Sequence, residues 1–564
     1  MRPVKRHWPF ALLAALALVL LLTNLGSDYL WADEGDTAVL ASNILKFDVP
    51  KAWDGVTFID ADFGARENSR LVMVSHPWVQ YYVAAASFYV LGENTFAARL
   101  PFALAGWLTI VLVYLFVWQI TAHRWTAFSA SALTVLSVQF LLYSRQCRNY
   151  SLHMLFTLWL FWIFFRMKSL RSCVLFILVA VLLFHTHPLG IVPVGVLGIL
   201  TLIYRPLAPQ RRWFWLAFPV VVIFTVPWLI LARTGLAENV VFASSAGDFL
   251  ERLGHYLLDC ASVTPILGVL ILLGISLVRR MGFLSQEEAT LVIITFATLL
   301  GYVLAIAESE TSGFLWLIGI RHSAALIPLL AMIAAILITK ISRCRLAIAL
   351  PLLLVFGFTR LADLTPWLFW AGQISPSHKG ALTTTAHVPN RLVDALLRPE
   401  QILFVRDLWH DNPGAVGKAC KFLQPLIKPG DRLIVNYSSE PFYFYTHLPQ
   451  ALKIFPYYPG YAIARQNGLP DYVFSIDHVH WIVWSLFWDK FNPYRWNDLE
   501  RDIVAQGGRI TQVAELNETI WENCENVRFR RYSGGRYVFP FAWQNLPPTG
   551  IFRVDWPDKV SAAP

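Results

Sequence analysis

Three carboxylates stand close together in the segment WADEGDTAVLASNILKF, which follows the first apolar run of the chain. Asp33, Glu34 and Asp36 come directly before a stretch with the apolar spacing of an amphipathic helix. A carboxylate held at this position could accept the proton of a hydroxyl group that attacks a carbon bearing a leaving group. An acid at a helix start can instead cap free N–H groups and favour the positive end of the helix dipole. Capping accounts for only one of these acids, so we predict a functional role for Asp33 and a capping role for Asp36.

Two arginines in the segment YSRQCRNYSL are candidates for binding an anion. A guanidinium group can hold a phosphate through paired hydrogen bonds, which suits both Arg145 and Arg148. The alternative is that these side chains extend to the phosphates of surrounding lipids. For Arg145 the two interpretations have equal weight, whereas for Arg148 we predict that it binds the phosphate of a substrate.

The segment GIRHSAALIP places Arg321 and His322 at the start of a long apolar run. A buried arginine at this position is costly unless it meets an anion. We therefore predict that Arg321 and its neighbour His322 bind substrate. The alternative for Arg321 is an ion pair with Glu308 or Glu310.

The segment HTHPLG carries His185 and His187, two residues apart, at the end of an apolar run. Residues with this spacing point in different directions on a helix, so we predict hydrogen bonds to a sugar or phosphate rather than metal binding. The six cysteines are dispersed without a CxxC pair, so the sequence indicates neither a zinc site nor a redox motif. No cofactor is assigned, and a divalent cation is left open.

The composition places most of these 564 residues in a membrane. Hydrophobic residues make up 56% and charged residues 15% of the chain, and the mean hydropathy is +0.51. The net charge of +9 could indicate nucleic-acid binding, but Lys and Arg fall in short clusters between apolar runs. That pattern reports membrane orientation, so no nucleic acid is expected as a partner.

The apolar runs predict an all-α bundle of about eleven to thirteen helices that crosses the membrane many times. The predicted spans are residues 8–25, 97–120, 125–143, 149–166, 172–186, 188–204, 213–232, 257–278, 288–307, 314–339 and 344–359. Residues 76–91 are also apolar, but a crossing there would put the later basic clusters outside. We therefore predict a surface or re-entrant helix for that segment.

The basic connectors alternate along the chain, and an N-terminus inside the cell places all of them on the cytoplasmic side. They contain Arg124, Arg166, Lys168, Arg171, Arg205, Arg211, Arg212, Arg279, Arg280, Lys340, Arg343 and Arg345. The segments that this orientation puts outside are 26–96, 143–149, 185–188, 232–256, 308–313 and everything after residue 360. The candidate residues named above are therefore expected on the outer face.

The chain changes composition in its last third, where charged residues, proline and glycine return. We predict a membrane domain over residues 1–373 and an extracytoplasmic soluble α/β domain over residues 374–564. Within the second domain the patterns predict helices at 414–427 and 498–505 and strands at 432–437, 480–486 and 537–543.

Three motifs in this order resemble a known family. They are the acidic pair after the first apolar run, the segment SHPWVQYY with His76, and the segment ENTFAARLPFALAG, which opens the next span. The chain resembles the protein mannosyltransferase and aminoarabinose transferase superfamily, whose members use polyprenyl-phosphate sugars and have the GT-C fold. The resemblance is closest over about the first third of the chain and rests on architecture for the remainder.

The resemblance also implies roles for individual residues. It makes Asp33 the catalytic base, gives Glu34 a supporting place beside it in the catalytic site, and adds His76 to the substrate-binding residues. It places Arg321 near the phosphate of the carrier.

In the family, an external loop often supplies a second acid, in a pattern that YSRQCRNYSL matches at Arg148 and Tyr150. We therefore add Tyr150 to the predicted substrate-binding residues. Gln146 stands where the family has a glutamate, so the sequence gives no support for a second carboxylate or for a metal held between two loops.

The resemblance implies an inverting glycosyltransferase whose donor is a sugar on undecaprenyl or dolichyl phosphate and whose acceptor is a lipid, a glycan or a protein. We expect this enzyme in the bacterial inner membrane, with a cytoplasmic N-terminus and an extracytoplasmic C-terminal domain. The alternative, from another class, is a transporter or flippase of polyprenyl-linked sugars. That class needs ionisable residues along a path through the membrane and repeated broken helices, and the sequence shows neither pattern.

Overall fold

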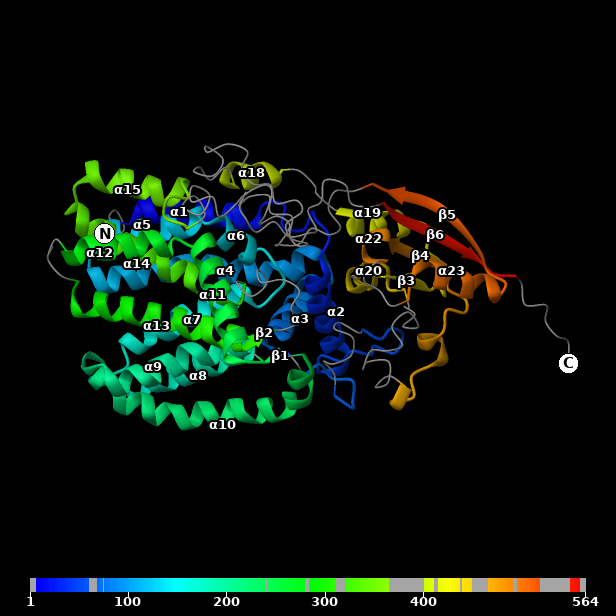
Figure 1. Ribbon diagram of the computed structural model, residues 1–564, viewed down its shortest axis with the longest axis horizontal. Helices are drawn as coiled ribbons and strands as arrows, with labels where there is room; N and C mark the ends of the chain where they lie inside the picture. The colour runs from blue at the N-terminus through cyan, green and yellow to red at the C-terminus, as the bar shows by residue number, and fades with distance from the viewer. Residues whose placement is uncertain are drawn as a thin grey trace.

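The computed structural model describes residues 7–59, 68–74, 76–239, 241–242, 244–278, 284–310, 321–364, 400–409, 414–436, 439–448, 465–489, 494–517 and 548–557. A bundle of helices occupies one end of the molecule, and a small sheet with its own helices occupies the other (Figure 1). Helices α2 (Ala32–Phe47) and α3 (Val79–Leu91) lie between these two parts (Figure 1).

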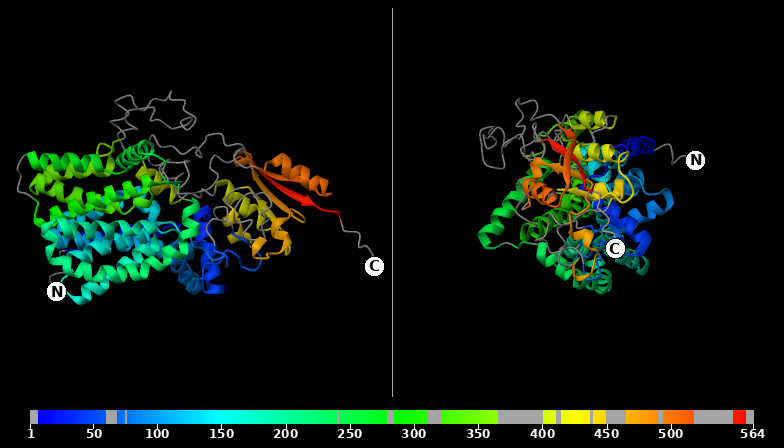
Figure 2. Two further views of the ribbon diagram at one scale, coloured as in Figure 1. Left: turned by 60° about the horizontal axis from the view of Figure 1, so that its bottom comes forward. Right: turned by 90° about the vertical axis from the view of Figure 1, so that its right-hand side faces the viewer.

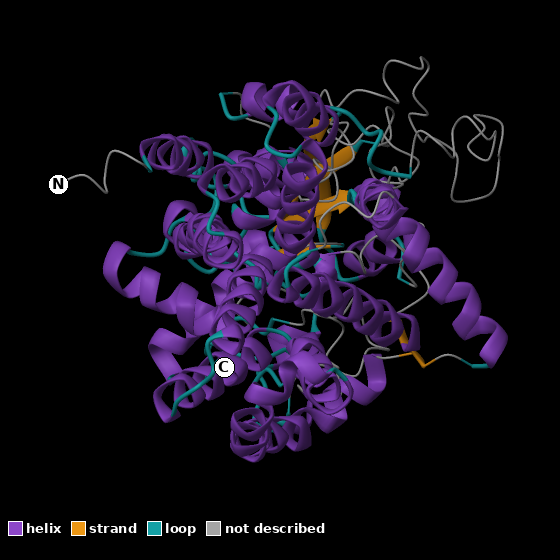
Figure 3. Ribbon diagram, turned by 90° about the vertical axis from the view of Figure 1, so that its left-hand side faces the viewer, coloured by secondary structure: helices purple, strands orange, loops and turns teal. Residues whose placement is uncertain are grey.

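The bundle, which Figure 3 shows end on, is formed by helices from the first two thirds of the chain. They are α1 (Trp8–Leu22), α4 (Thr95–Thr121), α5 (Arg124–Leu136), α6 (Val138–Ser144), α7 (Tyr150–Phe165), α8 (Leu170–Thr186), α9 (Ile191–Ile203), α10 (Ala208–Asn239), α11 (Ala246–Val263), α12 (Ile266–Val278), α13 (Gln286–Glu308), α14 (Leu326–Ser342) and α15 (Leu346–Phe358). Short 3-10 helices η2 (Pro188–Gly190) and η3 (Arg205–Leu207) precede α9 and α10, and β1 (Val241–Phe242) pairs antiparallel with β2 (Ser309–Glu310).

Many of these helices are apolar enough to lie in a membrane. Among the described residues, three helices are also long enough to cross it, and the bent pair of α5 and α6 makes a fourth if it counts as one span. Further apolar helices of 10–17 residues accompany them. The molecule is therefore mostly helical and apolar, as the sequence predicts, whereas the number of spans stays a prediction.

Two of the predicted spans are each divided into two helices. The run 125–143 is interrupted at Ser137, where the chain bends by 71° between α5 and α6. The run 257–278 is interrupted at Thr264 and Pro265, between α11 and α12. Proline disfavours helical backbone in the residue before it, which explains the second break. The prediction of one continuous helix at each of these places was wrong.

The C-terminal part contains a mixed four-stranded sheet in the order β3-β4-β6-β5. Its last strands, drawn in orange and red, lie at the end of the molecule away from the bundle (Figure 2). β3 (Leu433–Val435) runs parallel to β4 (Trp481–Ser485), and β6 (Thr549–Asp555) pairs antiparallel with both β4 and β5 (Arg509–Leu516). The helices of this part are α18 (Glu400–Asp407), α19 (Gly414–Leu423), α20 (Ser439–Thr446), α22 (Leu486–Asp489) and α23 (Trp496–Ala505), with the 3-10 helix η5 (Asp471–Phe474).

The sheet has a hydrophobic core on each face, because alternate residues of a strand point to opposite sides. Leu433 and Val435 of β3 join the core that contains residues of α19 and α20. Ile434, between them, joins the core that contains residues of α23. The predicted domain boundary at 373, the predicted strand 537–543 and the start of the predicted span 314–339 lie outside the described residues.

Helix α20 of the C-terminal part packs directly against α2. A Cβ atom on Gly35 would lie 2.7 Å from the nitrogen of Pro441, so the two helices approach at a position where only glycine fits without a shift. Tyr445 reaches across the same interface: its hydroxyl accepts from the N–H of Leu30 at 2.9 Å and lies 2.7 Å from Thr95 Oγ1. The C-terminal part therefore braces the start of α2, where the acidic residues lie.

Candidate active site

The first turn of α2 carries the acidic residues that the sequence singles out. The N-cap is Trp31, whose N–H lies 3.4 Å from Glu34 Oε2, so the acid that caps this helix is Glu34. The prediction that Asp36 is the cap was wrong, because its Oδ2 faces Arg148 Nη1 at 3.5 Å instead. The helix start thus holds carboxylates in three different environments.

The Asp33 carboxylate is held between two guanidinium groups that come from distant parts of the chain. Its Oδ2 accepts from Arg321 Nη1 at 2.9 Å and lies 3.3 Å from Arg148 Nη2. The Asp33 side chain keeps 24% of its accessible surface, against 5% for Arg148, so the carboxylate is open to a substrate. The side chains of Glu308 and Glu310, the alternative partners of Arg321, lie outside the described residues.

Arg148 comes from the connector between α6 and α7 and is fixed by several acceptors of α2. Its Nη1 donates to the backbone oxygen of Asp33 at 3.1 Å and to Thr37 Oγ1 at 3.1 Å. Burial by itself would lower the pKa of Arg148, but the charges of Asp33, Tyr150 and Asp36 outweigh it and raise this pKa above its ordinary value. Arg148 is therefore a permanent, immobilised cation beside Asp33.

Glu34 points away from Asp33 and forms a buried ion pair with Arg99 of α4. Arg99 donates from Nε to Glu34 Oε1 at 2.8 Å and from Nη2 to Oε2 at 2.6 Å, and Glu34 is fully buried. The N–H of Cys147 also donates to Oε1, at 2.8 Å. Because Cys147 directly precedes Arg148, the Glu34 carboxylate sets the position of the connector that delivers Arg148 to Asp33.

Arg145 and His185 occupy other surroundings than the sequence predicts. Arg145 donates to the backbone oxygens of Leu20, Leu21 and Thr23 at 2.9 Å each, so its guanidinium group caps the C-terminal end of α1. His185 Nε2 lies 2.9 Å from the backbone oxygen of Phe224 on α10. The structure therefore gives both residues contacts that stabilise the bundle.

Three imidazole rings lie in a row that ends beside Arg321 in sequence. We call this set, which consists of His153, His187 and His322, the histidine row. The centroids of His187 and His322 are 4.7 Å apart, and those of His153 and His187 are 5.6 Å apart. His153 Nε2 lies 2.8 Å from the hydroxyl of Tyr302 on α13. The sequence predicts His187 and His322 but misses His153, whose only signal is one imidazole inside the apolar run of α7.

The remaining predicted residues lie close to the same group. The guanidinium carbon of Arg321 lies 6.0 Å from the ring centroid of Tyr150, at the limit of a cation–π contact. His76 is near enough to His322 for the two imidazoles to interact electrostatically. Residues from three segments predicted to be external, 26–96, 143–149 and 185–188, are thus brought together with Arg321 and His322.

The sequence does not decide whether the protein binds a divalent cation. Within the ranges that the structure describes, no three His, Cys, Asp or Glu side chains are placed so that they could share a metal ion. No metal ligands are assigned among these residues, and a requirement for a divalent cation stays untested.

Comparison with known proteins gives the fold and the class. Residues 75–231 match the family of dolichyl-phosphate-mannose-protein mannosyltransferases. The fold is similar to the crystal structure of ArnT from Cupriavidus metallidurans bound to undecaprenyl phosphate, with a TM-score of 0.57 and 14% sequence identity over 97% of this chain and 98% of that chain. The chain therefore has the GT-C fold of that structure, and residues 75–231 match a glycosyltransferase family.

The apo state of the same ArnT matches this chain with a TM-score of 0.53 and 15% identity, over 97% of this chain and 98% of that chain. No protein with a curated description matches the chain in sequence. The family match over residues 75–231 and the fold agree with the predicted resemblance to the protein mannosyltransferase and aminoarabinose transferase superfamily. The family that matches residues 75–231 is one of transferases, not of transporters or flippases.

Proposed function

We propose that this protein is an inverting glycosyltransferase that moves a sugar from a polyprenyl phosphate to a hydroxyl group of a lipid, glycan or protein. The observation that carries the proposal is the accessible Asp33 carboxylate between the guanidinium groups of Arg148 and Arg321. The fold similarity to an enzyme bound to undecaprenyl phosphate supports a carrier of this chemical class.

Asp33 acts as the base. It takes the proton of the acceptor hydroxyl while the hydroxyl oxygen forms a bond to the anomeric carbon of the donor sugar. The bond from that carbon to the phosphate oxygen breaks, and polyprenyl phosphate leaves with one additional negative charge. A single displacement of this kind inverts the configuration at the anomeric carbon.

Arg148 and Arg321 stabilise the negative charge that develops on the leaving phosphate. A guanidinium group has five N–H donors, so Arg321 can bind a phosphate oxygen while one of its donors stays on Asp33. This arrangement brings base and leaving group to the same cation. His76, Tyr150, His187 and His322 complete the substrate-binding surface. Glu34 acts as a positioning residue through Cys147.

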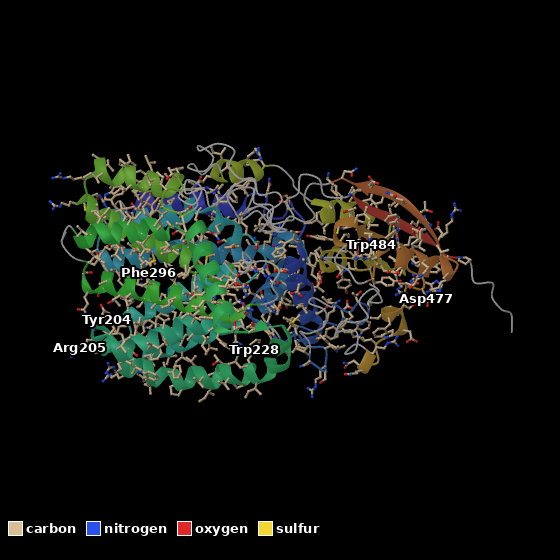
Figure 4. The ribbon with its side chains drawn as sticks, in the orientation of Figure 1. Tyr204, Arg205, Trp228, Phe296, Asp477 and Trp484 are labelled. Atoms are coloured by element: carbon tan, nitrogen blue, oxygen red, sulfur yellow. The ribbon has the colours of Figure 1, made fainter. Side chains whose placement is uncertain are left out.

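The reaction takes place at the outer face of a bacterial inner membrane in this proposal. Support comes from the positions of the basic connectors. Arg205, which belongs to one of them, lies at the end of the bundle far from Trp484 in the C-terminal sheet (Figure 4). With the basic end in the cytoplasm, Asp33 and the C-terminal part are extracytoplasmic.

The test is sugar transfer by the purified Asp33→Asn variant, with a panel of undecaprenyl-phosphate-linked sugars as donors. We expect the rate to fall by about 10² to 10⁴-fold, because the amide cannot accept the proton, while binding of undecaprenyl phosphate is retained. Asp48→Asn is the matched control, because Asp48 is exposed at the other end of α2 in a left-handed conformation that asparagine tolerates. Transfer at the normal rate by Asp33→Asn would exclude the proposed role.

A further inference from the structure

The histidine row joins three separate elements of the bundle. His153 lies on α7, His187 directly follows α8, and His322 precedes α14. The row starts at Tyr302, which contacts His153, and ends at His322, the neighbour in sequence of the arginine that holds Asp33. The reaction described above gives His187 and His322 a place on the substrate-binding surface without saying which part of the substrate they contact, and it gives His153 no task.

Two nitrogens of the row are buried and unpaired. In the part of the chain that the structure describes, Nδ1 of His153 and Nδ1 of His322 have no hydrogen-bond partner, and His153 is only 3% exposed. Native proteins leave few buried polar atoms unpaired, because each costs about 1–3 kcal/mol. The contacts inside the protein therefore account for only part of the hydrogen-bonding capacity of these rings.

The charge of the rings limits what they can bind. Burial lowers the pKa of His187 well below the usual 6.5, and His322, His153 and Arg321 lower it further. His322 is the neighbour of Arg321 in sequence and lies close to His187. Neutral imidazole offers one donor and one acceptor, which suits a hydroxyl group, whereas a phosphate is better served by the guanidinium groups nearby.

The hydrogen bonds already formed fix part of this capacity. The N–H of Leu189 donates to Nδ1 of His187 at 3.1 Å, so we assign the proton of the neutral His187 ring to Nε2, which can donate. The hydroxyl of Tyr302 occupies Nε2 of His153, which leaves Nδ1 for another partner. The row thus presents a set of neutral donors and acceptors next to the cations.

We propose that His153, His187 and His322 form the subsite for the sugar ring of the donor and that they recognise its uncharged hydroxyl groups. This inference rests on the proposed function and deepens it, because it names the part of the donor that each group of residues binds. The arginines bind the phosphate, Asp33 works at the anomeric carbon, and the histidine row binds the hydroxyl groups of the same sugar.

The test compares two ligands on the same variants: undecaprenyl phosphate and undecaprenyl-phosphate-linked sugars. Gln replaces His153 or His322, since its amide can keep a contact at the Nε2 position but has no group at Nδ1. We expect each variant to bind the sugar-bearing donor about 3- to 10-fold more weakly, the effect of one lost hydrogen bond. Its affinity for undecaprenyl phosphate should be unchanged.

Two controls separate a ligand contact from a structural one. Tyr302→Phe removes the internal partner of His153 and leaves Nδ1 in place, so it should preserve the preference for the sugar-bearing donor. His7→Gln changes a histidine that contacts Tyr114 and should alter neither affinity.

If the His153 and His322 variants lose affinity for both ligands equally, or for neither, the subsite assignment is overturned. If the wild-type protein binds neither ligand, the proposed function itself fails, which is a distinguishable result.

Discussion

The two sides of the first turn of α2 show how different surroundings separate two neighbouring acids. On the side that we call the scaffold side, Glu34 is fully buried and paired twice with Arg99 at 2.8 and 2.6 Å. On the side that we call the reactive side, Asp33 keeps 24% of its surface and meets two arginines from separate segments. Both carboxylates face guanidinium groups, yet only the second is accessible to a substrate. Residue type and spacing alone do not distinguish a carboxylate that stabilises the fold from one that can act as a base.

The largest expected effect comes from breaking the scaffold side. Arg99→Met leaves the Glu34 carboxylate buried without its cation, which typically costs about 3–5 kcal/mol of stability. We expect a much lower unfolding temperature in detergent, measured by fluorescence. Arg345→Met is the matched control, because Arg345 is exposed at the start of α15 and its loss should change stability by less than about 0.5 kcal/mol. A normal unfolding temperature for Arg99→Met would remove the distinction between the two sides.

A substitution on the reactive side should lower the rate of sugar transfer far more than it lowers the stability of the fold. Arg321→Gln removes one of the two cations from Asp33 and from the leaving phosphate, so we expect transfer to fall about 100-fold. The folded protein should persist, because Arg321 keeps 16% of its side-chain surface and its loss leaves Arg148 on Asp33. The measurement is the initial rate of transfer alongside the unfolding temperature. A variant that loses both equally would place Arg321 on the scaffold side.

Arg145 and Arg148 offer the same comparison within one connector. Arg145→Gln removes the cap from the end of α1, and we expect a loss of about 2 kcal/mol of stability with near-normal transfer. Arg148→Gln should show the opposite result, because it removes a cation from Asp33: the transfer rate should fall more than the stability. Parallel rate and unfolding measurements on the two variants check this. Equal rate losses would mean that Arg145 serves the reaction as well.

The smallest effect is expected at the contact between the bundle and the C-terminal part. Tyr445→Phe removes the hydroxyl that accepts a hydrogen bond from the N–H of Leu30 and contacts Thr95 Oγ1. We expect about 1 kcal/mol of lost stability and a transfer rate lowered by a few-fold, because the start of α2 is held less firmly. Thermal unfolding and transfer assays measure both changes. A rate loss as large as that of Arg321→Gln would give Tyr445 a direct part in the reaction.

The sequence predicts the reactive side better than the scaffold side. Charge alternation predicts that the segments of Asp33 and Arg148 lie on one face, at which the span containing Arg321 also begins, and the structure joins these residues. The partners of Arg145 are backbone oxygens at the end of α1. No residue pattern in the sequence indicates such a contact.

The misses have physical causes as well. A single histidine in an apolar run, such as His153, has no periodicity, so its role depends on neighbours from other helices. The break between α11 and α12 could have been read from Pro265, and the break at Ser137 carries no proline. In the C-terminal part, β3 and β4 fall within the predicted strands. β5 and β6, which pair with each other, lie outside the predicted strands and were missed.

The central claim is that Asp33 and its two arginines form the reacting centre. The most direct measurement is an experimental structure of the wild-type protein with undecaprenyl phosphate bound. We predict that the phosphate lies at hydrogen-bond distance, about 3 Å, from the guanidinium group of Arg321 and next to the Asp33 carboxylate. A phosphate bound at another place, with Asp33 and Arg321 far from it, would contradict the account.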